Sequence, residues 1–233
     1  MKIIVTGHTS GIGEALLDLF SINKYDVYGI SRNSSPKLEF SRQIELDLSR
    51  EKDINLAYEW AKKVNPDLFF HCAGSNPITP LIKASSKVYT DCFNLHFLSA
   101  SQICKGCIEI KKNNQFLKIF LISSIWSLIS ADSRGPYSIS KSALNTFARQ
   151  VAIEHGLNKV QALSIALGFV NTKLTNLTKN DERIINAKQR YLFSSDNLPT
   201  AKQVARILFD LSFQDLSLMN GNTLNLDGGI LCQ

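Results

Sequence analysis

Two side chains in the second half of the chain, Tyr137 and Lys141, have the types and the spacing of an acid–base pair. Residues four apart share one face of a helix, and the segment from Tyr137 to His155 has apolar residues at helical spacing. A free phenol has a pKa of about 10, and an ammonium group a few Å away favours its phenolate. The pair could therefore exchange a proton with an oxygen atom of a substrate.

The same spacing occurs at Tyr58 and Lys62, so the pattern alone does not identify a site. Ser123 and Ser124 end the apolar segment before Tyr137, whereas no suitable hydroxyl precedes Tyr58. Side chains at the carboxyl end of a parallel strand face the crevice in which α/β sheets bind ligands. We therefore interpret Tyr58 as part of an exposed helix face and place the candidate chemistry at Tyr137.

A glycine cluster, Gly7, Gly11 and Gly13, follows a short β-branched segment near the N-terminus. Glycine lets the backbone turn sharply and approach a pyrophosphate closely, and the N–H groups of the following helix favour its negative charge. A tight strand–helix turn without a ligand would show the same glycines. The turn is thus a candidate dinucleotide site that needs support from the rest of the chain.

The second predicted strand ends in Ser31-Arg32. An acidic residue at this place is typical of NAD binding, whereas an arginine accommodates the 2′-phosphate of NADP. The absence of an acid favours NADP over NAD, although a solvated arginine at a strand end is the alternative. Asp47 follows the third predicted strand, where it could accept a hydrogen bond from adenine or cap the next helix.

Short apolar segments and amphipathic segments alternate along the chain, which predicts parallel strands joined by helical crossovers. The predicted strands are Lys2–Thr6, Asp26–Ser31, Gln43–Leu46, Leu68–His71, Leu117–Ser123, Val160–Ala166 and Thr223–Leu226. The predicted helices are Glu14–Phe20, Glu51–Val64, Ser85–Lys111, Tyr137–His155 and Thr200–Leu211. Several strands are almost wholly apolar, so we expect helices on both faces of the sheet. We expect residues 1–233 to form a single domain, with the polar segment 173–198 as a substrate loop.

Composition excludes several other classes of protein. The chain has 26 lysine and arginine residues and 20 aspartate and glutamate residues, and it contains no run of five like charges. This charge balance favours an anionic small molecule over nucleic acid as the partner. The five cysteines are too few and too scattered for a disulfide framework, and Cys104 and Cys107 lack the partners of a metal site. The longest apolar stretch, Ile119 to Ile129, is shorter than a membrane span. We expect a soluble, cytoplasmic protein without metal, membrane or nucleic-acid partners.

In their order and spacing, the motifs resemble those of the short-chain dehydrogenases/reductases, and the resemblance extends from Lys2 to Gly229. The motifs are Gly7-His8-Thr9-Ser10-Gly11-Ile12-Gly13, Asp47-Leu48, Cys72-Ala73-Gly74, Asn94, Ser123-Ser124, Tyr137-Ser138-Ile139-Ser140-Lys141, Leu167-Gly168-Phe169-Val170-Asn171-Thr172 and Asp227-Gly228-Gly229. The resemblance is to the compact type and implies an α/β, Rossmann-like doubly wound parallel sheet of about seven strands in three layers. Cys72 and Leu167 depart from the asparagine and proline that the family usually has there.

The resemblance also implies roles for single residues. Tyr137 would be the proton donor or acceptor, and Lys141 would lower its pKa and bind the nicotinamide ribose. Ser124, 13 residues before Tyr137, would orient the substrate oxygen, and Asn94 would hold a water in a proton relay or make a hydrogen bond at a helix kink. The residues that would bind the cofactor are Gly7, Thr9, Ser10, Gly11, Ile12, Gly13, Ser31, Arg32, Asp47, Leu48, Cys72, Ala73, Gly74, Tyr137, Lys141, Gly168, Val170 and Thr172.

The expected function is therefore hydride transfer between NADP(H) and a carbonyl or secondary alcohol, with Tyr137 as general acid or base. One alternative is a nucleotide-sugar epimerase or dehydratase of the same family, and another is a non-catalytic NADP-binding regulatory protein. The intact Ser124, Tyr137 and Lys141 speak against the second alternative. By resemblance we also expect a homodimer or homotetramer paired through the helices around Asn94 and Tyr137.

Overall fold

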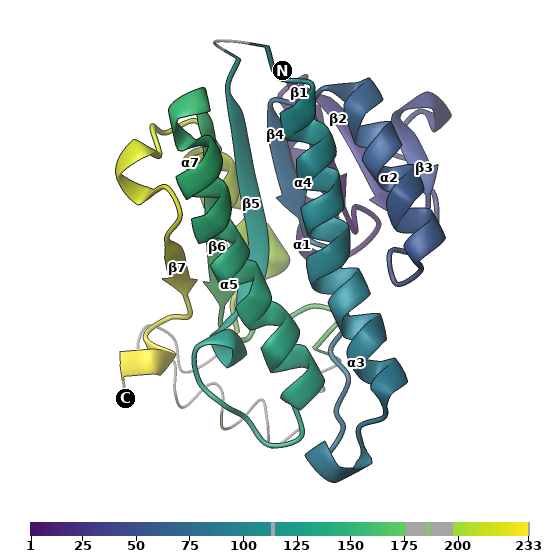
Figure 1. The fold of residues 1–233 in the computed structure, drawn as a ribbon. Helices are drawn as coiled ribbons and strands as arrows, with labels where there is room; N and C mark the ends of the chain where they lie inside the picture. Colours follow the sequence, from purple (N-terminus) through teal and green to yellow (C-terminus); the bar gives the residue numbers. More distant parts are fainter. Residues whose placement is uncertain (113–114, 176–185, 187–197, 233) are drawn as a thin grey trace.

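The computed structural model describes residues 1–112, 115–175, 186 and 198–232 and shows one seven-stranded sheet (Figure 1). Every neighbouring pair of strands is parallel, in the order β3-β2-β1-β4-β5-β6-β7. The strands are β1 (Lys2–Thr6), β2 (Asp26–Ser31), β3 (Gln43–Glu45), β4 (Leu68–His71), β5 (Leu117–Ser124), β6 (Val160–Leu167) and β7 (Thr223–Leu226). All seven coincide with predicted strands to within one residue at either end.

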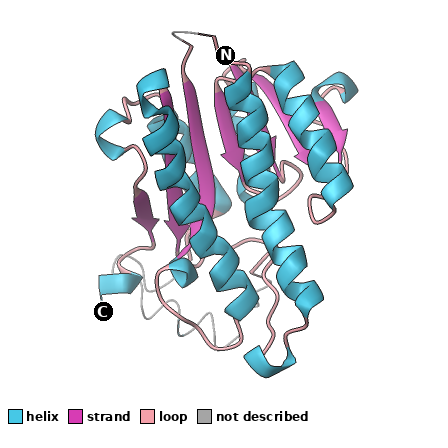
Figure 2. Cartoon of the chain, in the orientation of Figure 1, coloured by secondary structure: helices cyan, strands magenta, loops and turns pink. Residues whose placement is uncertain are grey.

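Helices cover both faces of the sheet, as the apolar strands predicted (Figure 2). One face carries α2 (Glu51–Val64), α4 (Ser99–Glu109) and α5 (Gly135–His155), and the other carries α1 (Gly11–Ile22) and α7 (Ala201–Ser212). Among the described residues no helix is both long and apolar enough to cross a membrane. The arrangement is the three-layered, doubly wound architecture expected from the sequence.

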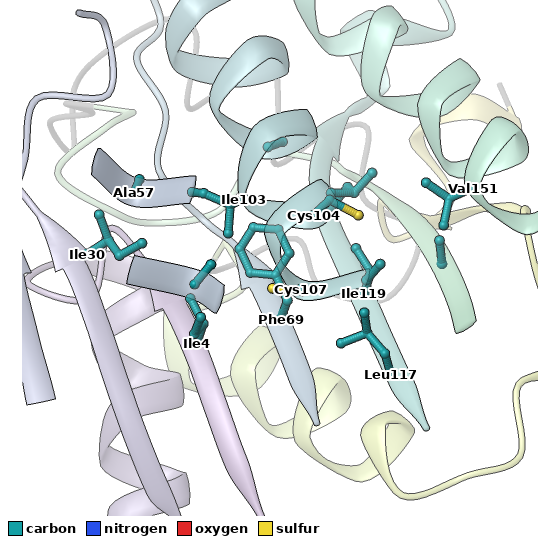
Figure 3. Packing of buried hydrophobic residues seen from close by; sticks show 14 of the residues in the cluster. Ile4, Ile30, Ala57, Phe69, Ile103, Cys104, Cys107, Leu117, Ile119 and Val151 are labelled. Atoms are coloured by element: carbon teal, nitrogen blue, oxygen red, sulfur yellow. The ribbon is translucent and has the colours of Figure 1, made fainter. Parts of the chain in front are cut away.

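The core lies in two layers because successive residues of a strand point to opposite faces. Phe69 of β4 packs with Ile103 and Cys107 of α4 on one face (Figure 3). Its neighbour Phe70 packs on the other face, where its ring stacks on that of Phe120 with centroids 4.7 Å apart. Both strands are therefore apolar at consecutive positions, which is typical of a sheet buried on both sides.

The predicted helix Ser85–Lys111 is interrupted in the structure. It consists of α3 (Ser86–Cys92), a π-helical segment (Phe93–Leu98) and α4, which ends at Glu109. A π-helical turn adds one residue to a helix. The apolar residues on both sides keep nearly the usual helical spacing, so the sequence pattern does not reveal the turn. The interruption contains Asn94, for which a hydrogen bond at a helix kink is one of the two predicted roles.

The order of the strands determines where along the edge of the sheet a ligand can bind. β1 lies between β2 and β4. The chain first runs outward from β1 through β2 to β3. It then returns to the other side of β1 at β4 and continues outward in the opposite direction to β7. The loops that follow β1 and β4 therefore diverge to opposite faces, which opens a crevice at their carboxyl ends. The glycine cluster after β1 and Cys72-Ala73-Gly74 after β4 both lie at this crevice.

Candidate active site

A cleft of about 690 Å³ lies where the loops leave the carboxyl ends of the strands. It brings together residues that are far apart in the sequence, from Gly7 to Thr175. The predicted site residues that line it are Gly7, Thr9, Ser10, Gly11, Ile12, Ser31, Arg32, Asp47, Leu48, Cys72, Ala73, Gly74, Ser124, Tyr137, Lys141, Gly168, Val170 and Thr172. Gly13 and Asn94 are the two predicted residues that do not.

The glycine turn has the geometry of an anion cradle. Gly7 and Gly11 have φ angles of +69° and +57°, which residues with a side chain rarely adopt. A Cβ on Gly13 would lie 2.4 Å from the carbonyl oxygen of Gly7, so this glycine permits α1 to approach the turn rather than touch a ligand. The N-cap Ser10 makes no side-chain capping bond, and the first-turn N–H groups of α1 have no helical acceptor.

The end of β2 presents hydroxyl groups and a guanidinium group to the cleft. Ser31 is buried, and its hydroxyl donates to the carbonyl of Asn33 at 2.6 Å and lies 3.3 Å from the hydroxyl of Thr9. Arg32 is exposed and lines the cleft. A phosphate group bound here would thus meet hydrogen-bond donors rather than a carboxylate at the strand end.

The loop after β3 is fixed by Asp47, whose carboxylate accepts hydrogen bonds from the amide and the hydroxyl of Ser49 at 3.1 and 2.8 Å. Burial acts to raise the pKa of Asp47, but the bonds from Ser49 and the charges of Arg50 and Arg32 hold it below its usual value. Asn94 joins the π-helical segment to the same loop, because its amide group donates to the carbonyl of Ser49 at 2.9 Å. The Asn94 side chain therefore supports the wall of the cleft from behind.

Ser124 and Tyr137 meet at the end of β5. The hydroxyl of Ser124 accepts a hydrogen bond from the amide of Trp126 at 3.2 Å, and Ser124 acts to lower the pKa of the Tyr137 phenol. Ser123 is directed elsewhere, since its hydroxyl lies 3.2 Å from the carbonyl of Lys141 in α5. Both serines line the cleft, and Ser124 is the one that acts on the pKa of Tyr137.

Lys141 is buried, one turn along α5 from Tyr137. Its ammonium group donates to the carbonyl of Ile122 at 2.6 Å and lies 5.9 Å from the centre of the Tyr137 ring. Burial lowers the pKa of Lys141 from its usual 10.5 to about 8. A Cβ on Gly74 would come within 3.6 Å of this ammonium group, so the glycine leaves room beside it.

The pKa of Tyr137 is raised above 10, the opposite direction to the one that the resemblance implied. Burial of the phenol is the largest cause, while the hydrogen bond with Ser124 and the positive charge of Arg134 act in the other direction. The ammonium group of Lys141, 5.9 Å from the centre of the ring, does not outweigh the burial. In this structure Tyr137 is therefore held protonated at neutral pH, which suits a proton donor.

The carboxyl end of β6 closes the cleft over the glycine turn. Gly168 donates its amide to the carbonyl of Leu226 at 3.1 Å, which ties this loop to β7. The methyl carbon of Thr172 would lie 3.6 Å from a Cβ on Gly11, so Thr172 lies against the glycine turn. The predicted substrate loop 173–198 lies outside the described residues except at positions 173–175, 186 and 198.

Two buried histidines, neither predicted from the sequence, support the site. His96 accepts a hydrogen bond from the amide of Ser75 at 2.9 Å through Nε2, so its Nδ1 carries the proton and donates to the hydroxyl of Ser140 at 2.7 Å. That hydroxyl donates to the carbonyl of Tyr137 at 2.8 Å, and the rings of His96 and Tyr137 meet edge to face. His96 lies two residues after Asn94, a spacing that puts side chains on different faces of a helix, so no helical pattern in the sequence points to it.

The second histidine, His71, fixes the loop after β4. The hydroxyl of Thr6 accepts from the amide of Ala73 at 3.0 Å and donates to Nδ1 of His71 at 3.1 Å. The Nε2 proton of His71 is donated to the carbonyl of Leu95 at 3.2 Å. This neutral ring links β1, β4 and the π-helical segment, so Cys72 can replace the usual asparagine while the loop stays anchored.

Acid should destabilise the protein through His71. Burial lowers the pKa of His71 from 6.5 to about 3. Between these values the unfolded chain binds a proton that the folded protein does not, so the free energy of unfolding falls as pH drops from about 6.5 toward 3. Urea unfolding of the unmutated protein and of His71→Gln at pH 7 and pH 5 measures this. His71→Gln should be less stable at pH 7 but lose less stability on acidification, and equal losses would contradict the assignment.

Several residues that line the cleft have no role predicted from the sequence. They include Ser75, Asn76, Asp91, Trp126, Arg134 and Phe169. The rings of Trp126 and Phe169 meet edge to face with centroids 5.8 Å apart. Arg134 is the N-cap of α5, three residues before Tyr137, and lies ahead of the helix that the sequence predicted from Tyr137.

Comparison with known proteins agrees with this geometry. Residues 7–231 match the family model described as enoyl-(acyl carrier protein) reductase. The chain is 22% identical to the 3-oxoacyl-(acyl-carrier-protein) reductase MabA of Mycobacterium bovis, over 98% of this chain and 92% of that protein. The fold is that of a 4-hydroxyisoleucine dehydrogenase complexed with NADH, with a TM-score of 0.87, 22% identity and coverage of 100% and 99% of the two chains.

A short-chain dehydrogenase from Burkholderia cenocepacia in complex with NADP has the same fold, with a TM-score of 0.85, 17% identity and coverage of 98% and 97%. These structures establish the fold, and the family model, which spans nearly the whole chain, establishes the family. The chain belongs to the short-chain dehydrogenases/reductases, NAD(P)-dependent oxidoreductases that act on CH–OH and C=O groups.

Proposed function

We propose that the protein transfers a hydride between NADP(H) and a carbonyl or secondary alcohol substrate, with Tyr137 as the general acid or base. The observation that carries the proposal is that Ser124, Tyr137 and Lys141 line the same cleft as the glycine turn and Arg32. A cleft of about 690 Å³ is in the range of small-molecule sites.

The residues present fit a dinucleotide. The glycine turn offers first-turn N–H groups to a pyrophosphate, and the positive φ angles of Gly7 and Gly11 keep side chains away from it. Gly74 leaves space beside Lys141, where the resemblance places the nicotinamide ribose. The hydride for the reaction would come from the reduced nicotinamide of the bound cofactor.

The chain's own groups would handle the oxygen of the substrate. In the reducing direction Tyr137 gives its phenolic proton to the oxygen as the carbonyl carbon receives the hydride. The hydroxyl of Ser124 already accepts a bond from the amide of Trp126, so its own hydrogen can be donated to the same oxygen. Loss of NADPH absorbance with a panel of ketones, aldehydes and oxoacyl thioesters tests the proposal. No turnover with either NADPH or NADH would refute it.

The choice of NADP over NAD rests on Arg32. A guanidinium group can make charge-assisted hydrogen bonds to the 2′-phosphate, each worth roughly 1.5–3 kcal/mol, and no carboxylate at Ser31 repels that phosphate. We expect tighter binding of NADPH than of NADH, and we expect Arg32→Ala to reduce the ratio of the two affinities at least tenfold. Fluorescence titration with both cofactors measures the ratio.

Arg50→Ala is the matched control, because Arg50 is also a cation near Asp47 but does not line the cleft. This variant should keep the preference for NADPH. Equal affinities for the two cofactors in the unmutated protein would contradict the assignment.

We also propose that the protein forms a homodimer or homotetramer. The exposed apolar side chains of Ile139 and Ile153 on α5 support this proposal, and sedimentation analysis tests it.

A further inference from the structure

Arg32, the residue proposed to select NADP, lies in the loop between β2 and β3 and not within a strand. It is exposed and lines the cleft. A guanidinium group on a loop discriminates well between ligands when the backbone already holds it near the bound group, because ordering a mobile segment weakens binding. The hydrogen bonds that hold this loop therefore bear on the choice of cofactor.

Gln43, the first residue of the edge strand β3, is bonded to this loop through both polar atoms of its amide group. Its Oε1 accepts from the backbone amide of Ser35 at 2.7 Å. Its Nε2 donates to the carbonyls of Ser35 and Leu38 at 3.0 and 2.8 Å. Three hydrogen bonds from one side chain thus fix the segment that begins three residues after Arg32.

His8, inside the glycine turn, is bonded to the same amide group. The Oε1 atom of Gln43 can only accept, so Nε2 of His8 carries the proton and donates to it at 3.3 Å. Burial lowers the pKa of His8 below its usual 6.5, so the ring is neutral at neutral pH. The ring is fully buried against β2, since a Cβ on Gly29 would lie 2.5 Å from it. His8 therefore connects the pyrophosphate turn to the loop through Gln43.

A second connection holds the other side of Arg32. The hydroxyl of Ser31 donates to the carbonyl of Asn33 at 2.6 Å, so the hydroxyl of Thr9, 3.3 Å away, donates to that of Ser31. The amide of the next residue, Ser34, donates to the carboxylate of Glu45 at 3.0 Å. The residues on both sides of Arg32 are thus bonded to the glycine turn or to β3, and its backbone is held between them.

We propose that Gln43 and His8 are positioning residues that hold the Arg32 loop against the glycine turn and so determine the preference for NADP over NAD. The inference rests on the proposed function and deepens its choice of cofactor. Neither residue lines the cleft, so both act through the loop. The two cofactors differ only in the 2′-phosphate, so displacement of this loop should weaken the binding of NADPH much more than that of NADH.

Gln43→Leu tests the inference, because leucine keeps much of the volume of glutamine and removes all of its hydrogen bonds. We expect the ratio of the affinities for NADPH and NADH to fall at least fivefold, mainly through weaker binding of NADPH, in fluorescence titrations with each cofactor. Gln161→Leu is the matched control, since Gln161 is buried in β6, donates to Asp215 at 3.3 Å and does not line the cleft. This variant should keep the ratio.

The same substitution in the Arg32→Ala background shows whether Gln43 acts through Arg32. There Gln43→Leu should lower the ratio no further, because the guanidinium group that the loop positions is already absent. A fivefold fall in both backgrounds would contradict the positioning role. Equal losses of affinity for NADPH and NADH in Gln43→Leu would likewise overturn the inference, since a merely structural role weakens both.

His8 provides an independent test, which also serves if thermal unfolding shows that Gln43→Leu is not folded. His8→Phe keeps a ring in the space above Gly29 but cannot donate to Gln43, and it should lower the ratio at least threefold. His8→Gln supplies an N–H donor again and should restore part of the preference. An unchanged ratio in His8→Phe would remove His8 from the proposal, and an unchanged ratio in every folded variant would overturn it.

The titrations contain no substrate, so they separate this inference from the proposed hydride transfer. Failure to reduce any carbonyl compound with either cofactor would refute the proposed reaction, while the titrations would still decide the role of Gln43 and His8. Equal affinities for NADPH and NADH in the unmutated protein would overturn both the assignment of Arg32 and this inference.

Discussion

Tyr137→Phe should lower kcat by at least about 100-fold while the affinity for NADPH is retained. General acid–base catalysis by one side chain contributes about 10²–10⁴-fold, and Tyr137 is the cleft residue placed to donate a proton beside Ser124. The substitution removes only the hydroxyl, and the ring can keep its edge-to-face contact with His96. Steady-state rates and fluorescence titration of the cofactor measure the two effects separately.

Tyr58→Phe is the matched control because Tyr58 and Lys62 repeat the spacing of the proposed pair. In the structure Tyr58 donates to Glu109, its hydroxyl lies 3.4 Å from the ammonium group of Lys62, and neither residue lines the cleft. This variant should keep its rate to within a few-fold. Similar losses in both variants would show that the acid–base group has been misplaced.

The sequence predicted the fold well because the strands are buried on both faces. A short apolar run such as that of β4, with Phe69 and Phe70 in opposite layers, is typical of a strand covered on two sides. The interruption around Asn94 escaped prediction because a π-helical turn depends on local backbone bonding rather than on the apolar pattern. Parallel pairing and the point where the strand order reverses then determine where the cleft must lie.

Individual residues of the site could be predicted only where they belong to a sequence motif of the family. Asn94 carries a family motif, but its side chain reaches Ser49 behind the cleft wall and does not enter the cleft. His71 and His96 lie outside any motif, and their roles depend on hydrogen bonds between segments that the sequence does not place together. Arg134 is the N-cap of α5, and its contact with Asn76 depends on two loops that follow different strands.

The direction of the Tyr137 pKa also needed the structure. The spacing predicted that the charge of Lys141 favours the phenolate. In the structure its ammonium group is bonded to the carbonyl of Ile122 at 2.6 Å, and burial lowers its own pKa to about 8. Burial then dominates at the tyrosine and raises its pKa. The phenol is thus protonated at neutral pH, the state in which it can donate a proton.

Lys141→Met should weaken NADPH binding and reduce turnover, and it should shift the pH profile of alcohol oxidation to higher pH. Oxidation requires Tyr137 to accept a proton, and the positive charge of Lys141 favours the phenolate. Without that charge the pKa of Tyr137 rises further, so the rate of oxidation should climb only at higher pH. In the unmutated protein the ammonium group loses its proton as pH passes about 8, and its help to cofactor binding should be lost there.

Methionine is a suitable replacement because it fills much of the buried volume of the lysine stem without a charge. It leaves the carbonyl of Ile122 without its donor, which costs about 1–3 kcal/mol, but it also removes a charge that is costly to bury. Thermal unfolding should therefore show a folded variant. Lys62→Met, in the second copy of the spacing, is the control and should change neither the affinity for NADPH nor the pH profile. An unshifted profile together with full cofactor affinity in Lys141→Met would mean that this lysine serves only to hold β5 against α5.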